Sequence, residues 1–255
     1  MHSLIIAFAM YSKIPMPKAE WTEKNMRYAF CWFPLVGLVT GLLEMAVFRL
    51  LLFCQAGPVI RGALLTAVPL IVTGGIHLDG FMDTTDARSS YGDRDKKLAI
   101  LKDSHVGAFA VMGCGLYLLL SAGAWSELDW RGMQLMVWVF VLERALSGLA
   151  AVNFKGARSD GMLTAFREPA RRKQVTAVLI VVAIVAVLIM ARVWLPGAAF
   201  CAAAALLVLG RYYRMAMREF GGTTGDLAGW FLQTCKLVLL LVLVVLRKVE
   251  WICVL

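Results

Sequence analysis

The sequence contains little charge for a chain of its length. Asp, Glu, Lys and Arg together make up 17% of the 255 residues, whereas an average soluble domain contains about 25%. Hydrophobic residues make up 60%, and the mean hydropathy is +0.74. This scarcity of charge excludes an ordinary soluble domain and predicts an integral membrane protein.

Paired cysteines and the common nucleotide-binding and hydrolase motifs are also missing. The six cysteines are scattered, so neither a disulfide framework nor a zinc site is indicated. There is no G-x-x-x-x-G-K-[ST] loop and no G-x-S-x-G elbow. The net charge of +9 forms no basic stripe interleaved with aromatic residues, so no nucleic-acid partner is expected. The N-terminal apolar run follows no basic segment, so we expect no signal peptide.

Long apolar runs are present instead, several near the roughly 20 residues that a helix needs to cross a bilayer. The candidate spans are 28–54, 59–76, 106–126, 132–152, 175–195, 196–210 and 227–246. The sixth is short, and Pro196-Gly197 predicts a turn before it, although 175–210 could be one bent element. We expect one all-α integral-membrane domain over residues 1–255, a polytopic helical bundle of about six or seven transmembrane helices. The sequence is compatible with a homo-oligomer and does not determine the oligomeric state.

The number of Lys and Arg residues in the connections between spans alternates between high and low along the chain. Under the positive-inside rule, this alternation places the N-terminus and the loops 77–105, 153–174 and 211–226 in the cytoplasm. Topology therefore explains most of the net charge, although the same loops could also bind an anion.

Six aspartates and no glutamate lie between positions 79 and 103. On a helix, Asp79, Asp83 and Asp86 fall within about 60° of each other. Because three like charges on one stripe repel, something positive should compensate them, and short carboxylates suit Mg²⁺. The alternative is a solvated loop with helix-capping aspartates, which we favour for Asp93 and Asp95.

The same segment, GIHLDGFMDTTDARSS over 75–90, carries glycines and a histidine. Gly74, Gly75 and Gly80 predict an interrupted span whose backbone can approach a ligand. His77 could be a general base, a phosphate donor or an interfacial cap. His105 begins the third span on the same predicted side.

The other loops predicted to be cytoplasmic are basic or rich in glycine. Lys155, Arg158 and Arg167 could hold phosphates, and Asp160 before Gly161 is typical of a tight loop. A separate basic cluster is interpreted as topogenic: Arg171, Arg172 and Lys173.

In EFGGTTGDLAG over 219–229, Asp226 could be a helix N-cap or a second metal or ribose contact. Acidic residues on one loop and cationic, glycine-rich elements on the others favour phosphoryl transfer.

Two charges fall inside the fourth span, where they are unfavourable unless paired or facing a wet interior. Glu143 and Arg144 are adjacent, so we expect them to have different partners. Lys236 and Glu44 are candidates for those partners, and snorkelling explains Lys236 equally well.

The motifs together resemble the cobalamin synthase family, the adenosylcobinamide-GDP ribazoletransferases, over nearly the whole chain. The element GG-x-HLDG-x-x-D-x-x-D is specific, and the others are persuasive in combination. They are FPLVG (Phe33–Gly37), TGGIHLDGFMDTTDA (Thr73–Ala87), LKDSHVGAF (Leu101–Phe109), ARSDGM (Ala157–Met162) and GGTTGD (Gly221–Asp226). Glu143 and Gln233 depart from that family's pattern.

The resemblance implies a Mg²⁺-dependent enzyme of the bacterial inner membrane with a cytoplasmic active site. Its substrates would be adenosylcobinamide-GDP and α-ribazole or its 5′-phosphate, with GMP as the leaving group. The metal ligands would be Asp79, Asp83 and Asp86. The catalytic residues would be His77, Asp83 and Asp103. The substrate-binding residues would be Lys102, Ser104, His105, Arg158, Asp160 and Asp226.

Two other classes compete with this interpretation. A CDP-alcohol phosphotransferase also holds Mg²⁺ with spaced aspartates, but it needs DG-x-x-AR, and here DG is followed by FMDTTDAR. A transporter would carry its charges near the middle of the bilayer, whereas these cluster at its predicted edge.

Overall fold

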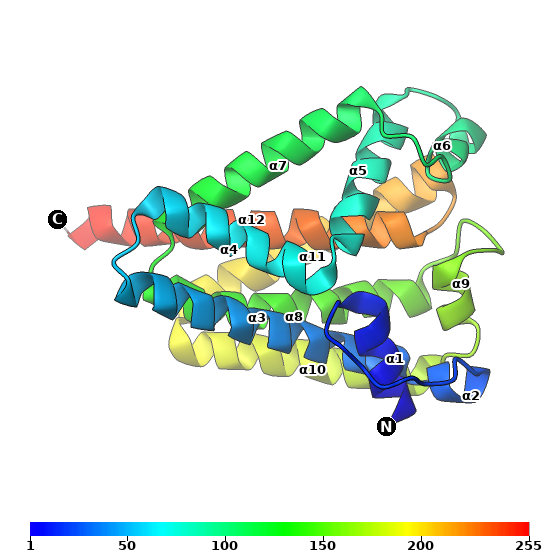
Figure 1. The fold of residues 1–255 in the computed structure, drawn as a ribbon, viewed down its shortest axis with the longest axis horizontal. Helices are drawn as coiled ribbons and strands as arrows, with labels where there is room; N and C mark the ends of the chain where they lie inside the picture. Colours follow the sequence, from blue (N-terminus) through cyan, green and yellow to red (C-terminus); the bar gives the residue numbers. More distant parts are fainter. Residues whose placement is uncertain (255) are drawn as a thin grey trace.

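The chain folds into a bundle of long helices with several short helices at one end (Figure 1). This computed structural model describes residues 1–254, and the side chains of all of these except 251, 253 and 254. The elements are α1 (His2–Tyr11), α2 (Glu23–Met26), α3 (Ala29–Phe53), α4 (Pro58–Thr73), α5 (Ile76–Ser89), α6 (Arg94–Ile100), α7 (Ala108–Glu127), α8 (Trp130–Asn153), α9 (Met162–Arg167), α10 (Arg172–Val193), α11 (Leu195–Met215), the π-helical turn η1 (Ala216–Phe220) and α12 (Gly225–Val254).

In the described part of the chain, six helices are long and apolar enough to cross a membrane, and α4 with α5 gives a seventh if the bent pair counts as one span. The all-α polytopic fold with about six or seven spans is therefore confirmed. α10 and α11 are separate helices, as Pro196-Gly197 predicted. The predicted end of the sixth span at residue 210 is wrong, because α11 continues to Met215. Arg211 and Arg214 do not end the helix, since their side chains are exposed.

α8 is the central helix of the bundle. It packs against α3, α10 and α12, and nearly all of it is buried, as expected for a helix that is apolar on every side. The outer helices α7 and α10 instead expose large apolar side chains such as Leu119 and Leu188. An apolar outer surface of this kind suits contact with lipid.

The break between α4 and α5 is the sharpest feature of the bundle. Gly74 and Gly75 have φ values of +64° and +78°, which glycine adopts without the penalty that a Cβ imposes. Their backbone amides donate to the carbonyls of Ile71 and Leu70, which closes the end of α4. The two helices meet at 99°, so α5 runs across the direction of α4 (Figure 1).

The motif-bearing loops gather at one end of the bundle, here called the site end. α2, α6, α9 and the connection from η1 to α12 lie there, whereas the α3–α4, α7–α8 and α10–α11 turns lie at the opposite end with the C-terminus (Figure 1). This arrangement agrees with the alternation of Lys and Arg. The compartment that the site end faces stays a prediction.

Candidate active site

The three aspartates of the predicted stripe lie on one helix, α5, as the spacing indicated. The charges of Asp79 and Asp86 both act on Asp83, as does the charge of Asp226. Among the described residues, none of these four carboxylates forms an ion pair with Lys or Arg. The site end therefore contains a local excess of negative charge drawn from two helices.

Asp226 reaches this group because α12 packs directly on α5. Gly80 makes the approach possible: a Cβ built on it would lie 2.8 Å from both the Cα and the carbonyl oxygen of Asp226. The prediction that Gly80 interrupts the span is wrong, since it lies inside α5. Its missing side chain serves close packing between helices. On the facing side, a Cβ on Gly229 would lie 2.9 Å from the His77 carbonyl oxygen.

The interpretation of Asp226 as a helix N-cap is also wrong. Thr224 takes that position, because its hydroxyl accepts a hydrogen bond from the Leu227 backbone amide at 3.3 Å. Asp226 lies one residue inside α12, where it accepts a hydrogen bond from the Thr224 hydroxyl at 3.3 Å. The alternative interpretation, a contact to metal or ribose, stays a prediction.

The four carboxylates fit a hard divalent cation in donor type and in charge. Mg²⁺ is usually held by one or two carboxylates together with phosphate oxygens and water, so a preformed all-protein cage is not required. Among the side chains that the structure describes, no three of His, Cys, Asp or Glu converge closely enough to form a ready-made metal centre. The predicted Mg²⁺ ligands Asp79, Asp83 and Asp86 therefore stay a prediction.

Cationic side chains enter the site end from two connections, Arg158 from the one between α8 and α9 and Lys102 from the one between α6 and α7. Arg158 donates a hydrogen bond to the Leu98 carbonyl at 2.5 Å, and its charge acts on Asp226. Lys102 pairs with Asp160 at 2.8 Å, and this hydrogen bond, together with the lysine charge, holds the pKa of the Asp160 carboxyl below its usual range. Arg158, Asp160 and Asp226 line a cavity of about 180 Å³.

Asp103 and His105 lie on the exposed connection between α6 and α7. The His105 backbone amide donates to Asp103 at 3.0 Å, and the ring Nδ1 lies 2.6 Å from the same oxygen. These hydrogen bonds hold the pKa of the Asp103 carboxyl below its usual range. The connection reaches the aspartate group at Gly107, where a Cβ would collide with the Asp86 carboxylate. The roles predicted for Asp103, Ser104 and His105 stay predictions.

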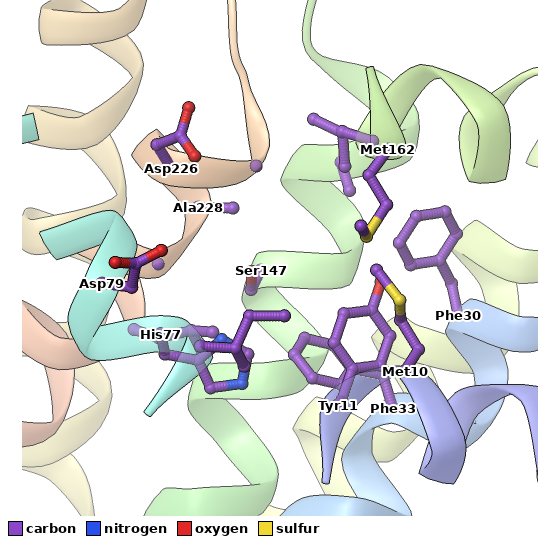
Figure 2. Close-up of a pocket in the computed structure, with 16 residues that line it drawn as sticks. Met10, Tyr11, Phe30, Phe33, His77, Asp79, Ser147, Met162, Asp226 and Ala228 are labelled. Atoms are coloured by element: carbon purple, nitrogen blue, oxygen red, sulfur yellow. The ribbon is translucent and has the colours of Figure 1, made fainter. Parts of the chain in front are cut away.

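A second cavity, of about 230 Å³, adjoins the carboxylates and has two unlike walls. Figure 2 shows Asp79, Asp226 and His77 on one side of it. The opposite wall is aromatic and sulfur-containing, and it comes from α1, α3 and the start of α9 (Figure 2). Its labelled members are Met10, Tyr11, Phe30, Phe33 and Met162.

Sequence reasoning missed this apolar wall, and α1 in particular. The apolar run His2–Tyr11 is too short to span a membrane, and a run of this length is typical of an interfacial or buried segment. The presence of such a short apolar run in a chain with a predicted polar site is the feature of the sequence that could have indicated an apolar wall. The motif FPLVG (Phe33–Gly37) marked one wall residue, Phe33, but indicated no role for it.

His77 lies where the two walls meet. Its ring is 6.1 Å from Tyr11 and 5.9 Å from Phe33, measured between centroids, and the residue is 7% exposed. Its Nε2 atom has no hydrogen-bond partner among the described residues. A buried ring nitrogen without a partner is unfavourable unless a ligand or water occupies that position, so His77 fits a substrate contact better than an interfacial cap.

The charges inside the fourth span pair differently from the prediction. Glu143 and Arg144 bond to each other, with Oε1 and Nη1 2.7 Å apart and both side chains 2% exposed. The expectation of separate partners is wrong, because the long arginine side chain folds back along α8 and also donates to the Phe140 carbonyl at 3.2 Å. Gln233 accepts a hydrogen bond from Tyr117 at 2.6 Å.

Glu44 and Lys236 belong to the same buried polar region. The charge of Lys236 acts on both Glu44 and Glu143. The suggested pairings of Lys236 with Glu143 and of Glu44 with Arg144 are nevertheless wrong among the described residues, because Glu143 and Arg144 pair with each other. Both carboxylate oxygens of Glu44 lack a hydrogen-bond partner among the described residues. Snorkelling does not describe Lys236, which is buried at 6% exposure.

The fold and the site together define a class of protein: a polytopic helical membrane enzyme whose polar residues converge at one end of its bundle. The chain belongs to the cobalamin-5-phosphate synthase family, whose model matches residues 3–244. This match confirms the family that the motifs indicated.

Individual relatives agree with the family match. The chain is similar to an adenosylcobinamide-GDP ribazoletransferase of Lachnoclostridium phytofermentans, with 43% identity covering 98% of this chain and 95% of the relative. A protein of the same name from Desulfitobacterium hafniense is 33% identical, covering 94% and 96% of the two chains. A third, from Clostridium perfringens strain 13, is 31% identical over 89% and 91%. No solved structure matches the chain.

Proposed function

We propose that this enzyme transfers the phosphocobinamide part of adenosylcobinamide-GDP to α-ribazole or its 5′-phosphate, with Mg²⁺ as cofactor. A ribose hydroxyl of the acceptor attacks the phosphorus atom attached to the cobinamide side chain. The bond from that phosphorus to the bridging oxygen breaks, and GMP leaves with the oxygen. The products are adenosylcobalamin, or its 5′-phosphate, and GMP.

The residues of the site divide this work between carboxylates and cations. Asp79, Asp83 and Asp86 would hold Mg²⁺, which when bound neutralises the negative charge of the pyrophosphate. Arg158 and Lys102 would orient the pyrophosphate by hydrogen bonds to its oxygens. The proton of the attacking hydroxyl would pass to His77 or to one of the α5 carboxylates.

The remaining candidates would complete the polar surface around the reacting groups. Asp226 faces α5 across the Gly80 contact, where it would contact the acceptor ribose or a second metal ion. Asp103, Ser104 and His105 would bind substrate from the connection that reaches Asp86.

One observation carries the proposal. The charges of Asp79, Asp86 and Asp226 act on Asp83. None of these four carboxylates, from α5 and α12, forms an ion pair among the described residues, and Arg158 lines one cavity with Asp226. This combination of clustered carboxylates with a guanidinium suits metal-assisted transfer of a phosphate group. The names of the relatives indicate which phosphate ester and which acceptor such a site would use.

A direct assay tests the reaction. Purified protein in detergent with Mg²⁺, adenosylcobinamide-GDP and α-ribazole should release GMP and form adenosylcobalamin in equal amounts, measured by chromatography. Chelation of the metal with EDTA should stop both, and added Mg²⁺ should restore them. Absence of GMP release under these conditions would exclude the proposed reaction.

Substitution of Asp83 tests the carboxylate group. Asp83→Asn keeps the size of the side chain and removes its charge, so it should abolish turnover while the thermal midpoint stays the same or rises, because repulsion from Asp79 and Asp86 is relieved. Asp95→Asn is the matched control, since Asp95 is exposed in the first turn of α6. Near-normal turnover of the Asp83 variant would remove this residue from the metal site.

The cytoplasmic location of the site at the bacterial inner membrane is proposed on the distribution of Lys and Arg. Reporter fusions at Arg94 and Lys173 should both report the cytoplasm. A report of opposite sides would separate the loops that the bundle brings together at the site end.

A further inference from the structure

The cavity with unlike walls is too small for most of the substrate atoms in the proposed reaction. Its volume is about 230 Å³, whereas pockets for drug-sized ligands span about 300–1,000 Å³. A cavity of about 150 Å³ is known to accept benzene. The space therefore fits a two-ring aromatic group and excludes a corrin ring.

The chemistry of the walls discriminates between the two aromatic bases in the proposed reaction. Guanine carries an exocyclic amine, a carbonyl and a ring N–H, all of which need hydrogen-bond partners. The side chains of Met10, Phe30 and Phe33 offer none, and Tyr11 adds a single hydroxyl to this wall (Figure 2). A guanine held against it would keep unpaired polar groups, each of which would weaken binding by about 5- to 150-fold. The dimethylbenzimidazole base of α-ribazole is apolar apart from its ring nitrogens, so it suits this wall.

We infer that this cavity, between α1, α3 and α5, binds the apolar two-ring base of the acceptor nucleoside. The inference rests on the proposed function and specifies where that function selects its acceptor. His77 lines the cavity with an unpartnered Nε2 and is the hydrogen-bond donor to the free ring nitrogen of the base, so the α5 carboxylates receive the proton of the ribose hydroxyl. Tyr11, Phe33 and the two methionines contact the faces and edges of its rings.

The position of the cavity relative to the carboxylates supports this orientation. Asp79 and Asp226 lie on the wall opposite the aromatic rings (Figure 2), so a base held against those rings directs its ribose toward the carboxylates. The cavity around Arg158 shares Met162 and Asp226 with this one. The phosphates of the donor can therefore lie next to Arg158 while the acceptor base occupies the apolar side.

Met162 allows the cavity to be filled with little risk to the fold. It begins α9, is 56% exposed and lines the cavity. Met162→Trp places a larger side chain at the edge of the cavity. Met112→Trp is the matched control, since Met112 is 58% exposed on α7 and does not line this cavity.

The test uses the full-length protein in detergent and two measurements. Calorimetric titration with free dimethylbenzimidazole, corrected for its uptake by empty micelles, should show binding to the wild type and to Met112→Trp, and binding about tenfold or more weaker for Met162→Trp. In the transferase assay, Met162→Trp should raise KM for α-ribazole by a similar factor and KM for adenosylcobinamide-GDP by clearly less, since Met162 lies only at the edge of the cavity around Arg158. Free guanine should not compete with dimethylbenzimidazole.

Three results would overturn the inference: equal binding of the base to both variants, no binding to the wild type at millimolar concentration, or a rise in KM for the donor in place of the acceptor. Failure of the proposed function gives a different result. In that case the wild type releases no GMP, whatever the base titration shows.

Discussion

Replacing Gly80 with alanine should lower kcat strongly while it changes the free energy of unfolding only a little. The added Cβ would lie 2.8 Å from the backbone of Asp226, and real Cβ contacts are essentially never shorter than 3.0 Å. Because the neighbour is backbone, no side chain can turn aside to make room. α5 and α12 would have to separate by about 0.6 Å, the difference between 2.8 Å and the 3.4 Å at which ordinary contact begins.

The two consequences of this separation differ in size. Overpacking in a close-packed interface destabilises by about 1–3 kcal/mol, and alanine recovers about 1 kcal/mol as a better helix residue than glycine. The free energy of unfolding should therefore fall by about 0–2 kcal/mol. Misplacement of reacting groups by about 1 Å can reduce a rate about 100-fold, so kcat should fall about tenfold or more.

The assay is GMP release at saturating substrates, with thermal unfolding of the same preparations as the measure of stability. Gly115→Ala is the matched control, because a Cβ at Gly115, in the middle of α7, would meet nothing within 4 Å. That variant should keep its kcat and unfold at an equal or higher temperature. A Gly80→Ala enzyme with kcat within about twofold of the wild type would refute the idea that contact between α5 and α12 positions the carboxylates.

The ion pairs of the structure yield two further predictions. Lys102→Ala should leave the unfolding temperature nearly unchanged, because the pair with Asp160 is 55% and 66% exposed and exposed pairs contribute at most about 1 kcal/mol. It should raise KM for adenosylcobinamide-GDP severalfold, and an unchanged KM would exclude Lys102 from donor binding. Arg144→Met should destabilise by about 3–5 kcal/mol, because it leaves Glu143 charged and buried without its partner. The double variant with Glu143→Leu should unfold at a higher temperature than Arg144→Met alone, and failure of this rescue would show that the pair is not the cause.

The parts of the site that depend on local pattern could be predicted from the sequence. Apolar run length identifies the spans, and the spacing of four and three places Asp79, Asp83 and Asp86 on one side of α5. The bend at Gly74 and Gly75 could also be predicted, since consecutive glycines after an apolar run permit the positive φ values that the bend requires.

The parts that depend on tertiary contact could not be predicted in this way. Gly80 resembles a helix breaker in the sequence, and only the backbone of α12 beside it shows that it serves close packing. The pairing of Glu143 with Arg144 depends on a flexible side chain folding along its own helix, which helical spacing does not describe. The position of the N-cap at Thr224 and not at Asp226 is a difference of two residues, finer than sequence patterns resolve.

The apolar wall contributed by α1 lies beyond sequence reasoning for a related cause. Met10 and Tyr11 are separated from Asp226 by most of the chain, and they meet only across the cavity. Hydrophobic pattern identifies α1 as apolar, but it does not show which surface the helix covers.

The bend after α4 explains how one bundle can offer both an apolar and a charged surface to substrates. At 1.5 Å per residue, the 16 residues of α4 extend about 24 Å, less than the roughly 30 Å of a hydrocarbon core. A straight continuation would carry the polar face of α5 out beyond the bundle. The turn of 99° instead lays α5 against α12 and α7, and the amides of Gly74 and Gly75 are satisfied by carbonyls of α4, as a break near lipid requires. The carboxylates are thereby held among packed helices, where electrostatic interactions are stronger than in water, and the rings of α1 and α3 lie within reach of the same ligand. The interrupted span of α4 and α5 therefore allows carboxylates and aromatic rings from several helices to line one cavity.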